Sequence, residues 1–354
     1  MRVRQQTKEN IRQLLYAILI ALSLLYLFGE TARQSNAGKK SAPPARVTGV
    51  AMVDADNFLS LVYAKYGERR ILENVTLEDG SLIRIVDILR YDSITSDGAM
   101  RRSVARIIEA PRITAKFAAH SYSRLLLPEK LSKNNVDTRK WKIDHDYLLQ
   151  NSYYHIGTES MFYCDGMKLS RDSDAAVLLL GLGGGVINGF LHHNFPKMRI
   201  TIAEISTRFA NVAMKWFDLK LGLRHSLVII DGAEFVLKQA KKGVKYDVII
   251  LDACYPNRRH KRVCPTGAFL TKNVLRAMSK LVKSQGIIVV NIALPRTRAE
   301  TDRVLQLFLK HFLYCNLRNT KFRNEILYCM HRSLSEEKHI DLFEFIKNNP
   351  LTKN

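Results

Sequence analysis

Five stretches of continuous apolar residues recur along the C-terminal half of the chain, most of them followed by glycine or a polar residue. They read AAVLLLG, RITIAEI, SLVIIDG, YDVIILDA and GIIVVNIAL. Unbroken apolar runs of this length are typical of strands buried on both faces of a parallel sheet. Segments with helical spacing, such as TRFANVAMKWFDLKLG and NVLRAMSKLVKS, separate them. Because strand and helix alternate, we expect an α/β fold with an open, doubly wound, Rossmann-like sheet over residues 171–354.

Residues 50–110 follow a different pattern, with short runs in which apolar and polar positions alternate: NFLSLVYAKYG, RRILENVTL and SLIRIVDILRY. Asp79-Gly80 and Asp97-Gly98 lie between such runs, and these dipeptides are favoured in two-residue hairpin turns. The pattern predicts a small antiparallel β unit. Residues 111–170 are mixed and are expected to be mostly helical, so residues 50–170 would form a small unit of β-hairpins and helices.

The N-terminus carries an uncharged apolar segment, QLLYAILIALSLLYLFG, at residues 13–29. As a helix it would be about 25 Å long, at the short end for crossing a bilayer. A slight excess of basic residues before it places the N-terminus in the cytosol. We therefore expect a cytosolic tail and transmembrane signal anchor at residues 1–30, a flexible stalk at residues 31–49, and a domain in the lumen or outside the cell. A cleaved signal peptide is the alternative, and a cytosolic orientation stays open. The sequon Asn74-Val75-Thr76 agrees with the lumenal orientation, although such triplets also arise by chance.

Composition adds a charge imbalance and a set of isolated cysteines. Lys and Arg outnumber Asp and Glu by 55 to 33, which favours anionic partners or surfaces. The basic run NRRHKR at residues 257–262 has no interleaved aromatic residues, and the chain has no recognised nucleic-acid motif, so no nucleic-acid partner is expected. The five cysteines include no C-x-x-C pair and no zinc spacing, so no metal is expected. Their odd number favours buried or free thiols over a disulfide framework.

Residues at the carboxyl ends of the predicted strands carry the candidate chemistry, because ligands of doubly wound sheets bind there. These residues are Gly181, Gly183 and Gly185 after the first strand, Glu204 after the second, Asp231 and Gly232 after the third, and Asp252 after the fourth. Glycines let the backbone turn sharply and approach a ligand in front of a helix N-terminus. A carboxylate after the second strand can accept hydrogen bonds from ribose hydroxyls, and one after the third can accept from an exocyclic amine. The set therefore predicts an adenosine-bearing ligand. Val186 stands where a dinucleotide fingerprint needs a third small residue, which weakens a nicotinamide alternative.

These residues resemble the S-adenosylmethionine site of seven-stranded methyltransferases, and more narrowly the branch shared with spermidine synthases. Within that branch the chain resembles the C-terminal half of the lysine and N-terminal methyltransferases of elongation factor 1-alpha. The matching stretches are GLGGGVINGFLHHNFP, AEISTRFANVAMKWF, DGAEFV, YDVIILDACYPN, VCPTGAFL and NEILYC, with weaker matches in MRRSVARIIEAPRI and IDHDYL. The resemblance covers roughly residues 100–331 and leaves out the predicted anchor.

The resemblance implies S-adenosylmethionine as the cofactor and a protein amine, a lysine or an N-terminus, as the methyl acceptor. It implies the following roles: Gly181, Gly183 and Gly185 around the methionine moiety, Glu204 at the ribose, Asp231 and Gly232 beside the adenine, and Asp252 at both the cofactor and the amine, as the catalytic residue. Tyr147 and Tyr153 would form the acceptor wall or pack in the core.

The segment after Asp252 departs from the relatives, which carry further acidic residues there. Tyr255 replaces the second Asp with which spermidine synthases hold a polyamine, so aminopropyl transfer is disfavoured. The same loss keeps open a catalytically inactive binding module. The basic run at residues 257–262 would be either a solvated loop or a rim that attracts an acidic protein substrate. Elongation factor 1-alpha is cytosolic, so either the predicted lumenal orientation or the substrate differs from what the resemblance implies.

Overall fold

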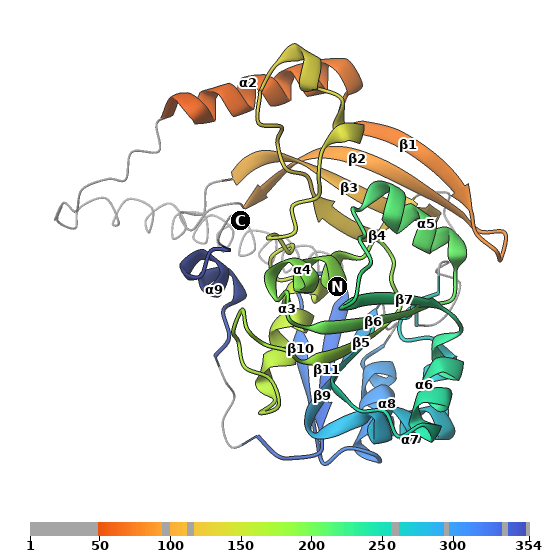
Figure 1. Ribbon diagram of the computed structural model, residues 1–354. Helices are drawn as coiled ribbons and strands as arrows, with labels where there is room; N and C mark the ends of the chain where they lie inside the picture. The colour runs from red at the N-terminus through yellow and green to blue at the C-terminus, as the bar shows by residue number, and fades with distance from the viewer. Residues whose placement is uncertain are drawn as a thin grey trace, which may run out of the picture. The chain divides into compact units, whose positions relative to one another are not determined.

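The computed structural model describes residues 49–93, 100–111, 117–255, 262–293, 297–334 and 339–351. One compact unit, Met52–Asn354, holds a four-stranded antiparallel sheet and a seven-stranded mixed sheet (Figure 1). The predicted anchor at residues 13–29 lies outside the described residues, as does nearly all of the predicted stalk at residues 31–49. Within the described ranges, no helix combines the length and the apolarity that crossing a membrane requires.

The seven-stranded sheet is built mainly from the apolar runs of the C-terminal half. Its strands are β5 (Ala176–Leu180), β6 (Arg199–Glu204), β7 (His225–Ile229), β8 (Tyr246–Leu251), β9 (Val282–Ala293), β10 (Tyr314–Asn319) and β11 (Asn324–Met330). They lie in the order β10-β11-β9-β8-β5-β6-β7. The five strands β5 to β9 pair in parallel, whereas β11 is antiparallel to both of its neighbours. The predicted doubly wound α/β sheet is thus confirmed.

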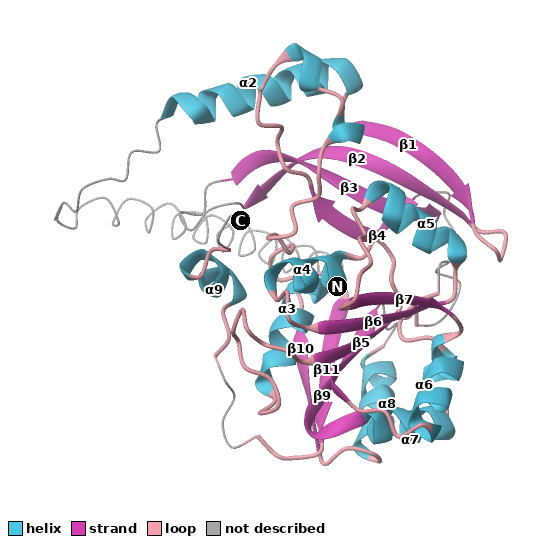
Figure 2. Ribbon diagram, in the orientation of Figure 1, coloured by secondary structure: helices cyan, strands magenta, loops and turns pink. Residues whose placement is uncertain are grey.

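Alternate residues of each central strand enter two separate cores, one on each face of the sheet. Val177 and Leu179 of β5 belong to one core, and Leu178 and Leu180 belong to the other. Helices pack against each face of the sheet, as Figure 2 also shows. The first face is covered by α3 (Tyr153–Ser160), α4 (Val186–Asn194) and α9 (Leu342–Asn348), and the second by α6 (Gly232–Lys241), α7 (Lys272–Leu281) and α8 (Arg298–Leu309). Strands covered on both faces need continuous apolar sequences, which explains the runs.

The antiparallel sheet has the strand order β1-β2-β3-β4. Its strands are β1 (Arg69–Thr76), β2 (Leu82–Ser93), β3 (Met100–Pro111) and β4 (Phe117–Arg124). The predicted turn at Asp79-Gly80 joins β1 to β2, with Gly80 at φ +77°. Asp97-Gly98 lies outside the described residues.

Two expectations for the N-terminal half are wrong. NFLSLVYAKYG is not a strand but the second half of helix α2 (Gly49–Tyr66). Phe58, Leu59 and Val62 share one buried face of this helix, at a spacing that fits a helix better than a strand. Residues 111–170 are not mostly helical. They hold β4, two short 3₁₀ helices (Lys133–Asn135 and Thr138–Lys140), the eight-residue helix α3 and a third 3₁₀ turn (Met161–Tyr163), joined by loops.

A buried ion pair joins the antiparallel sheet to helix α5 (Thr207–Trp216). Arg106 of β3 contacts Asp87 of β2 through bonds of 2.8 and 3.0 Å, and its Nη1 donates to the carbonyl of Trp216 at 2.9 Å. Both charged side chains are almost fully buried. Because a buried charge is costly unless it is paired and hydrogen-bonded, this contact fixes how the two parts meet.

The expectation of free thiols is wrong for four of the five cysteines. The structure pairs Cys254 with Cys264 and Cys315 with Cys329, whereas Cys164 is buried and free. Cys315 and Cys329 are direct partners in the register of β10 and β11. Cys264 approaches Cys254 because its segment returns to form a β-bridge with Ala293 at the end of β9. These pairings depend on strand register and loop path, which cysteine spacing does not reveal.

Candidate functional site

A cavity of about 480 Å³ opens at the carboxyl ends of β5, β6 and β8. It lies where β5 and β8 are neighbours and the strand order reverses, the usual ligand position in doubly wound sheets. Its volume is within the range of small-molecule sites. Of the predicted site residues, those that line it are Gly181, Gly183, Glu204, Asp231, Gly232 and Asp252. The strand order therefore brings together residues that the sequence places up to 71 positions apart.

The glycine turn after β5 forms one wall of the cavity. Gly181 has φ +103°, and a side-chain Cβ there would lie 2.5 Å from the backbone oxygen of Asp252, so no larger residue fits. Gly183 has φ +55° and open space around it. Gly185, at φ +71°, is the N-cap of α4 and borders a small adjacent hollow instead of the main cavity. Two of the three predicted glycines thus face the cavity, and the third starts the helix behind it.

Glu204 lies at the end of β6 with only 7% of its surface exposed. Its Oε2 accepts a hydrogen bond from the Leu182 N–H at 2.9 Å, and its Oε1 accepts one from the Ser206 N–H at 2.8 Å. Burial raises the pKa of this carboxyl group, and the backbone donors oppose that effect. Backbone N–H groups of Leu182, Ser206 and Ile205 bind this carboxylate, and since a carboxylate offers about four acceptor sites, at least one stays free for a ligand.

The β1–β2 hairpin supplies a wall of the cavity that the sequence did not indicate. Leu77, Glu78 and Asp79 all line it. Glu78 accepts hydrogen bonds from the Ser206 hydroxyl at 2.7 Å and the Arg208 N–H at 3.0 Å, at the start of α5. These contacts hold the hairpin against the same segment that Glu204 binds. No local pattern signals a contact across 128 residues.

Asp231 and Gly232 border the cavity at the start of α6. Asp231 is the N-cap of this helix, and its Oδ1 accepts from the N–H groups of Ala233 at 2.8 Å and Glu234 at 3.0 Å. Both bonds use one carboxylate oxygen, so capping does not occupy the other. A Cβ on Gly232 would lie 2.8 Å from Phe269 Cζ, which explains why glycine is needed there.

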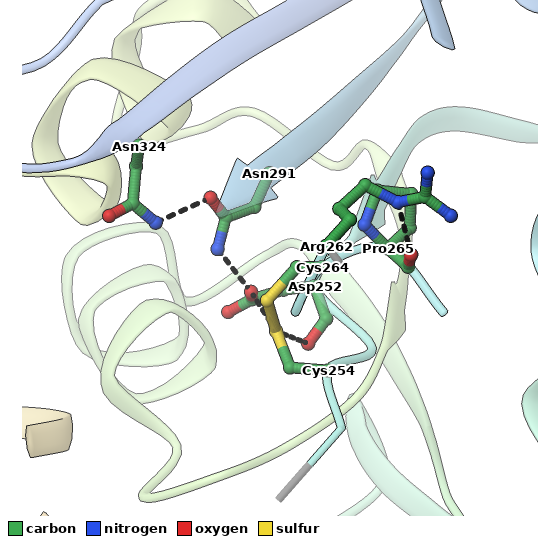
Figure 3. Close-up of a disulfide and its surroundings, with 7 residues drawn as sticks. All are labelled: Asp252, Cys254, Arg262, Cys264, Pro265, Asn291 and Asn324. Carbon is green, nitrogen blue, oxygen red and sulfur yellow. Dashed lines mark hydrogen bonds between the residues drawn. A yellow bond between two sulfur atoms is a disulfide. The ribbon is translucent and has the colours of Figure 1, made fainter. Parts of the chain in front are cut away.

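Asp252 directly follows β8 and accepts the last hydrogen bond in a chain of polar side chains (Figure 3). Asn324 of β11 donates from Nδ2 to Oδ1 of Asn291 at 2.8 Å, and Asn291 of β9 donates from Nδ2 to Oδ1 of Asp252 at 2.7 Å. Burial raises the pKa of Asp252 to about 6, although hydrogen bonds from Asn291 and the Tyr153 hydroxyl stabilise its ionised form. A carboxylate with this pKa can accept a proton near neutral pH.

Two tyrosines of α3 complete the surroundings of Asp252. Tyr153 and Tyr154 line the cavity, with ring centroids 3.9 Å apart. Burial is the main cause that raises the pKa of both phenols, and the nearby Asp252 charge adds to it, so both stay protonated at neutral pH. Of the two tyrosines named from the sequence, Tyr153 therefore reaches the cavity. Tyr147 is a core residue, stacked under Arg124 at 3.8 Å.

The segment after Asp252 is held by a disulfide. Cys254 lines the cavity, and its Sγ lies 3.4 Å from Oδ1 of Asp252 (Figure 3). Asp252, Cys254 and Cys264 have ligand-type atoms within 4.8 Å of one another, but the two sulfur atoms are bonded together and are not thiolate ligands. The hydroxyl of Tyr255 accepts from the Gly267 N–H at 3.1 Å. Of the basic run at residues 257–262, only Arg262 is described, and it donates from Nε to the Pro265 carbonyl at 2.9 Å.

Comparisons with known proteins identify similar chains, although no family model matches. The eEF1A lysine and N-terminal methyltransferase homolog of Drosophila melanogaster is 27% identical over 207 residues, which is 58% of this chain and 30% of that protein. The human eEF1A lysine and N-terminal methyltransferase is 30% identical over 166 residues, or 46% of this chain and 24% of that protein. The crystal structure of human methyltransferase-like protein 13 in complex with SAH gives a TM-score of 0.52 at 23% identity, and the match covers 57% of this chain and 95% of that one. The resemblance predicted from the sequence is confirmed, and the structural match shows the same fold. The chain spans less than a third of the length of these two curated relatives.

Proposed function

We propose that the chain is an S-adenosylmethionine-dependent methyltransferase that acts on an amine of a protein, either a lysine side chain or an N-terminus. The observation that carries the proposal is that Gly181, Glu204, Gly232 and Asp252 line one cavity. They come from four strand ends, in the order that the resemblance implies. The similarity to methyltransferases of eEF1A supports the reaction class.

The cavity residues fit the nucleoside and amino-acid parts of this cofactor. Glu204 keeps at least one free acceptor site, which suits a ribose hydroxyl. The backbone at Gly181 and Gly183 has no Cβ to obstruct a ligand, and the N-terminus of α4 behind it favours a carboxylate. One carboxylate oxygen of Asp231 is not used by the helix cap and could accept a hydrogen bond from the adenine amine. Gly232 beside it has no side chain and leaves room for the flat adenine ring. When bound, the cofactor supplies a methyl group already activated by its sulfonium.

Asp252 would take the proton from the acceptor amine. Protein amines have pKa values of roughly 8 to 10 and are mostly protonated at neutral pH, so they lack a free lone pair. With a pKa of about 6, Asp252 is mostly ionised at pH 7 and is a stronger base than an ordinary aspartate. Asn291 and the Tyr153 hydroxyl hold the carboxylate in one orientation, so its charge faces a fixed point of the cavity.

Two alternatives have less support. Aminopropyl transfer to a polyamine calls for a second acid after Asp252, and Tyr255 stands there with its hydroxyl bound to the Gly267 N–H, at the start of the 3₁₀ turn Gly267–Leu270. A catalytically inactive binding module would not need Asp252 to be held in the cavity by two hydrogen-bond donors.

We also propose that residues 13–29 anchor the domain in a membrane, on the basis of their uncharged apolar sequence. The excess of Lys and Arg, a formal charge of +22, favours an acidic protein as the substrate. Protease protection in microsomes tests the lumenal orientation that the anchor predicts: the domain should stay intact until detergent is added, and digestion of the domain in sealed vesicles would contradict that orientation.

Methyl transfer from isotope-labelled S-adenosylmethionine to proteins of a membrane extract tests the reaction. Asp252→Asn should lower the transfer by about 100-fold or more, as expected for loss of a general base, with cofactor affinity largely kept. Asp302→Asn, on the exposed face of α8, removes the same charge and should change nothing. Cofactor binding without transfer to any protein would favour the inactive module. Turnover of the decarboxylated cofactor instead would favour aminopropyl transfer.

A further inference from the structure

The two disulfides indicate the redox environment in which the domain is built. Cys315 and Cys329 lie opposite each other on β10 and β11 with Cα atoms 4.1 Å apart, and Cys254 and Cys264 have Cα atoms 4.4 Å apart. The pairs lie in different parts of the structure and arise from different causes, strand register and loop path. Structural disulfides are rare in cytosolic proteins and common in proteins of the secretory pathway. Pairing of four of the five cysteines therefore favours an oxidising compartment.

The sequon at Asn74 is placed where a glycan would not disturb the fold. It lies on β1, an edge strand of the antiparallel sheet. Asn74 and Thr76 are exposed, whereas Val75 between them packs against the core. A glycan is added to the chain before it folds, so a sequon whose asparagine pointed inward would prevent folding once modified. The triplet is the only Asn-x-Ser/Thr in the sequence, so one residue accounts for any N-linked glycan.

We propose that Asn74 is an N-glycosylation site and that the domain matures, with both disulfides formed, in the lumen of the secretory pathway. Glycosylation joins Asn74 Nδ2 to the anomeric carbon of an oligosaccharide. The bond from that carbon to its lipid diphosphate donor breaks, and the amide loses one proton. Each disulfide forms as two thiols give two electrons and two protons to the disulfide of a protein oxidant, which becomes a dithiol.

If the domain is a methyltransferase, as proposed above, its location in the lumen of the secretory pathway limits which proteins it can methylate. A lumenal domain is separated by a membrane from cytosolic elongation factor 1-alpha, so its acceptor would be a secreted, lumenal or extracellular protein. The Cys254–Cys264 disulfide contributes to the cavity itself, because Cys254 lines the cavity and contacts Asp252. Oxidation is thus part of the completed site and not only of the distant β10–β11 edge. The predicted orientation of the anchor agrees with this assignment.

The experiment is a mobility-shift and thiol-counting assay on the full chain made in cultured animal cells. Peptide N-glycosidase should shift the wild-type protein by one glycan. Asn74→Gln and Thr76→Ala should run at the deglycosylated position, whereas Thr76→Ser keeps the sequon and should still shift. A maleimide reagent, added after denaturation without reductant, should label one cysteine, Cys164, and all five after reduction.

Either of two results overturns the inference: a wild-type protein whose mobility does not respond to the glycosidase, or labelling of all five cysteines before reduction. Binding of S-adenosylhomocysteine, measured on the same preparations, separates this inference from the proposed function. A glycosylated, oxidised protein that does not bind the cofactor product would refute the methyltransferase and leave the compartment assignment intact. An unglycosylated, reduced protein that binds it would do the reverse.

Discussion

Glu204→Gln tests the cofactor site with the smallest change of shape. The native carboxylate accepts the Leu182 and Ser206 N–H groups on separate oxygens. A glutamine has one oxygen, so its NH₂ group must face one of these donors, and one N–H loses its partner. The ribose also loses a charged acceptor. A hydrogen bond to a charged group contributes about 1.5–3 kcal/mol, so Kd should rise by about 10- to 100-fold at 1.4 kcal/mol per factor of ten.

Titration calorimetry of the full chain with S-adenosylhomocysteine measures this difference. Glu234→Gln is the matched control, because Glu234 is exposed on α6 and pairs only with Lys238 among the ion pairs of the described chain. The control removes the same charge and should bind as the wild type does. Thermal unfolding of each variant shows that it is folded before binding is compared. A Kd for Glu204→Gln within about threefold of the control would refute the assignment of Glu204 to the ribose.

Three further predictions concern catalysis, the glycine turn and acid stability. Asn291→Ala removes a bond to ionised Asp252 worth about 1.5–3 kcal/mol, or roughly one to two pKa units. The acid limb of the pH–rate profile should therefore move up from about 6, and an unmoved limb would contradict this role of Asn291. Gly181→Ala places a Cβ 2.5 Å from a backbone oxygen and should lower the free energy of unfolding by more than about 2 kcal/mol. Gly183→Ala places a Cβ in open space and should lower it by about 1 kcal/mol. Urea unfolding measures both free energies. Burial lowers the pKa of His225 to about 4, so between pH 4 and about 6.5 the unfolded chain binds a proton that the folded chain does not bind. The free energy of unfolding should therefore be highest above pH of about 6.5 and fall towards pH 4. Urea titrations across this range should show a weaker dependence on pH for His225→Gln than for the wild type.

The sheet and the residues at its carboxyl edge could be predicted because each depends on local sequence. A strand buried on both faces must be apolar throughout, so β5 to β9 are visible as runs. Residues at the carboxyl ends of parallel strands share one edge of the sheet, where ligands bind, and this does not depend on the path of the loops. The sequence therefore predicts the positions of Glu204 and Asp252 at that edge. By contrast, the apolar residues of α2 lie close together in the sequence, and so short an apolar run does not separate a helix from a strand.

The remaining walls of the cavity depend on contacts between distant segments. Glu78 reaches Ser206 because the antiparallel sheet packs against α5, a contact to which the buried Arg106–Asp87 pair and the Glu73–Trp216 hydrogen bond contribute. The pairing of Cys315 with Cys329 follows from the register of two strands, and a shift of one residue would have separated them. A one-dimensional pattern contains no information on register or on the docking of one sheet against a helix.

The single acid after β8 is consistent with catalysis when its neighbours are considered. Burial alone pushes the pKa of Asp252 upward, and a second carboxylate at Tyr255 would push it further, because like charges disfavour ionisation. The structure instead surrounds Asp252 with neutral groups, the Asn291 amide and the Tyr153 hydroxyl, which both stabilise the ionised form. A pKa near 6 follows from this balance, and at that value one carboxylate is both charged enough to attract a protonated amine and basic enough to accept its proton. The proposed proton transfer therefore needs only this one acid, and Tyr255 in place of a second acid is compatible with it.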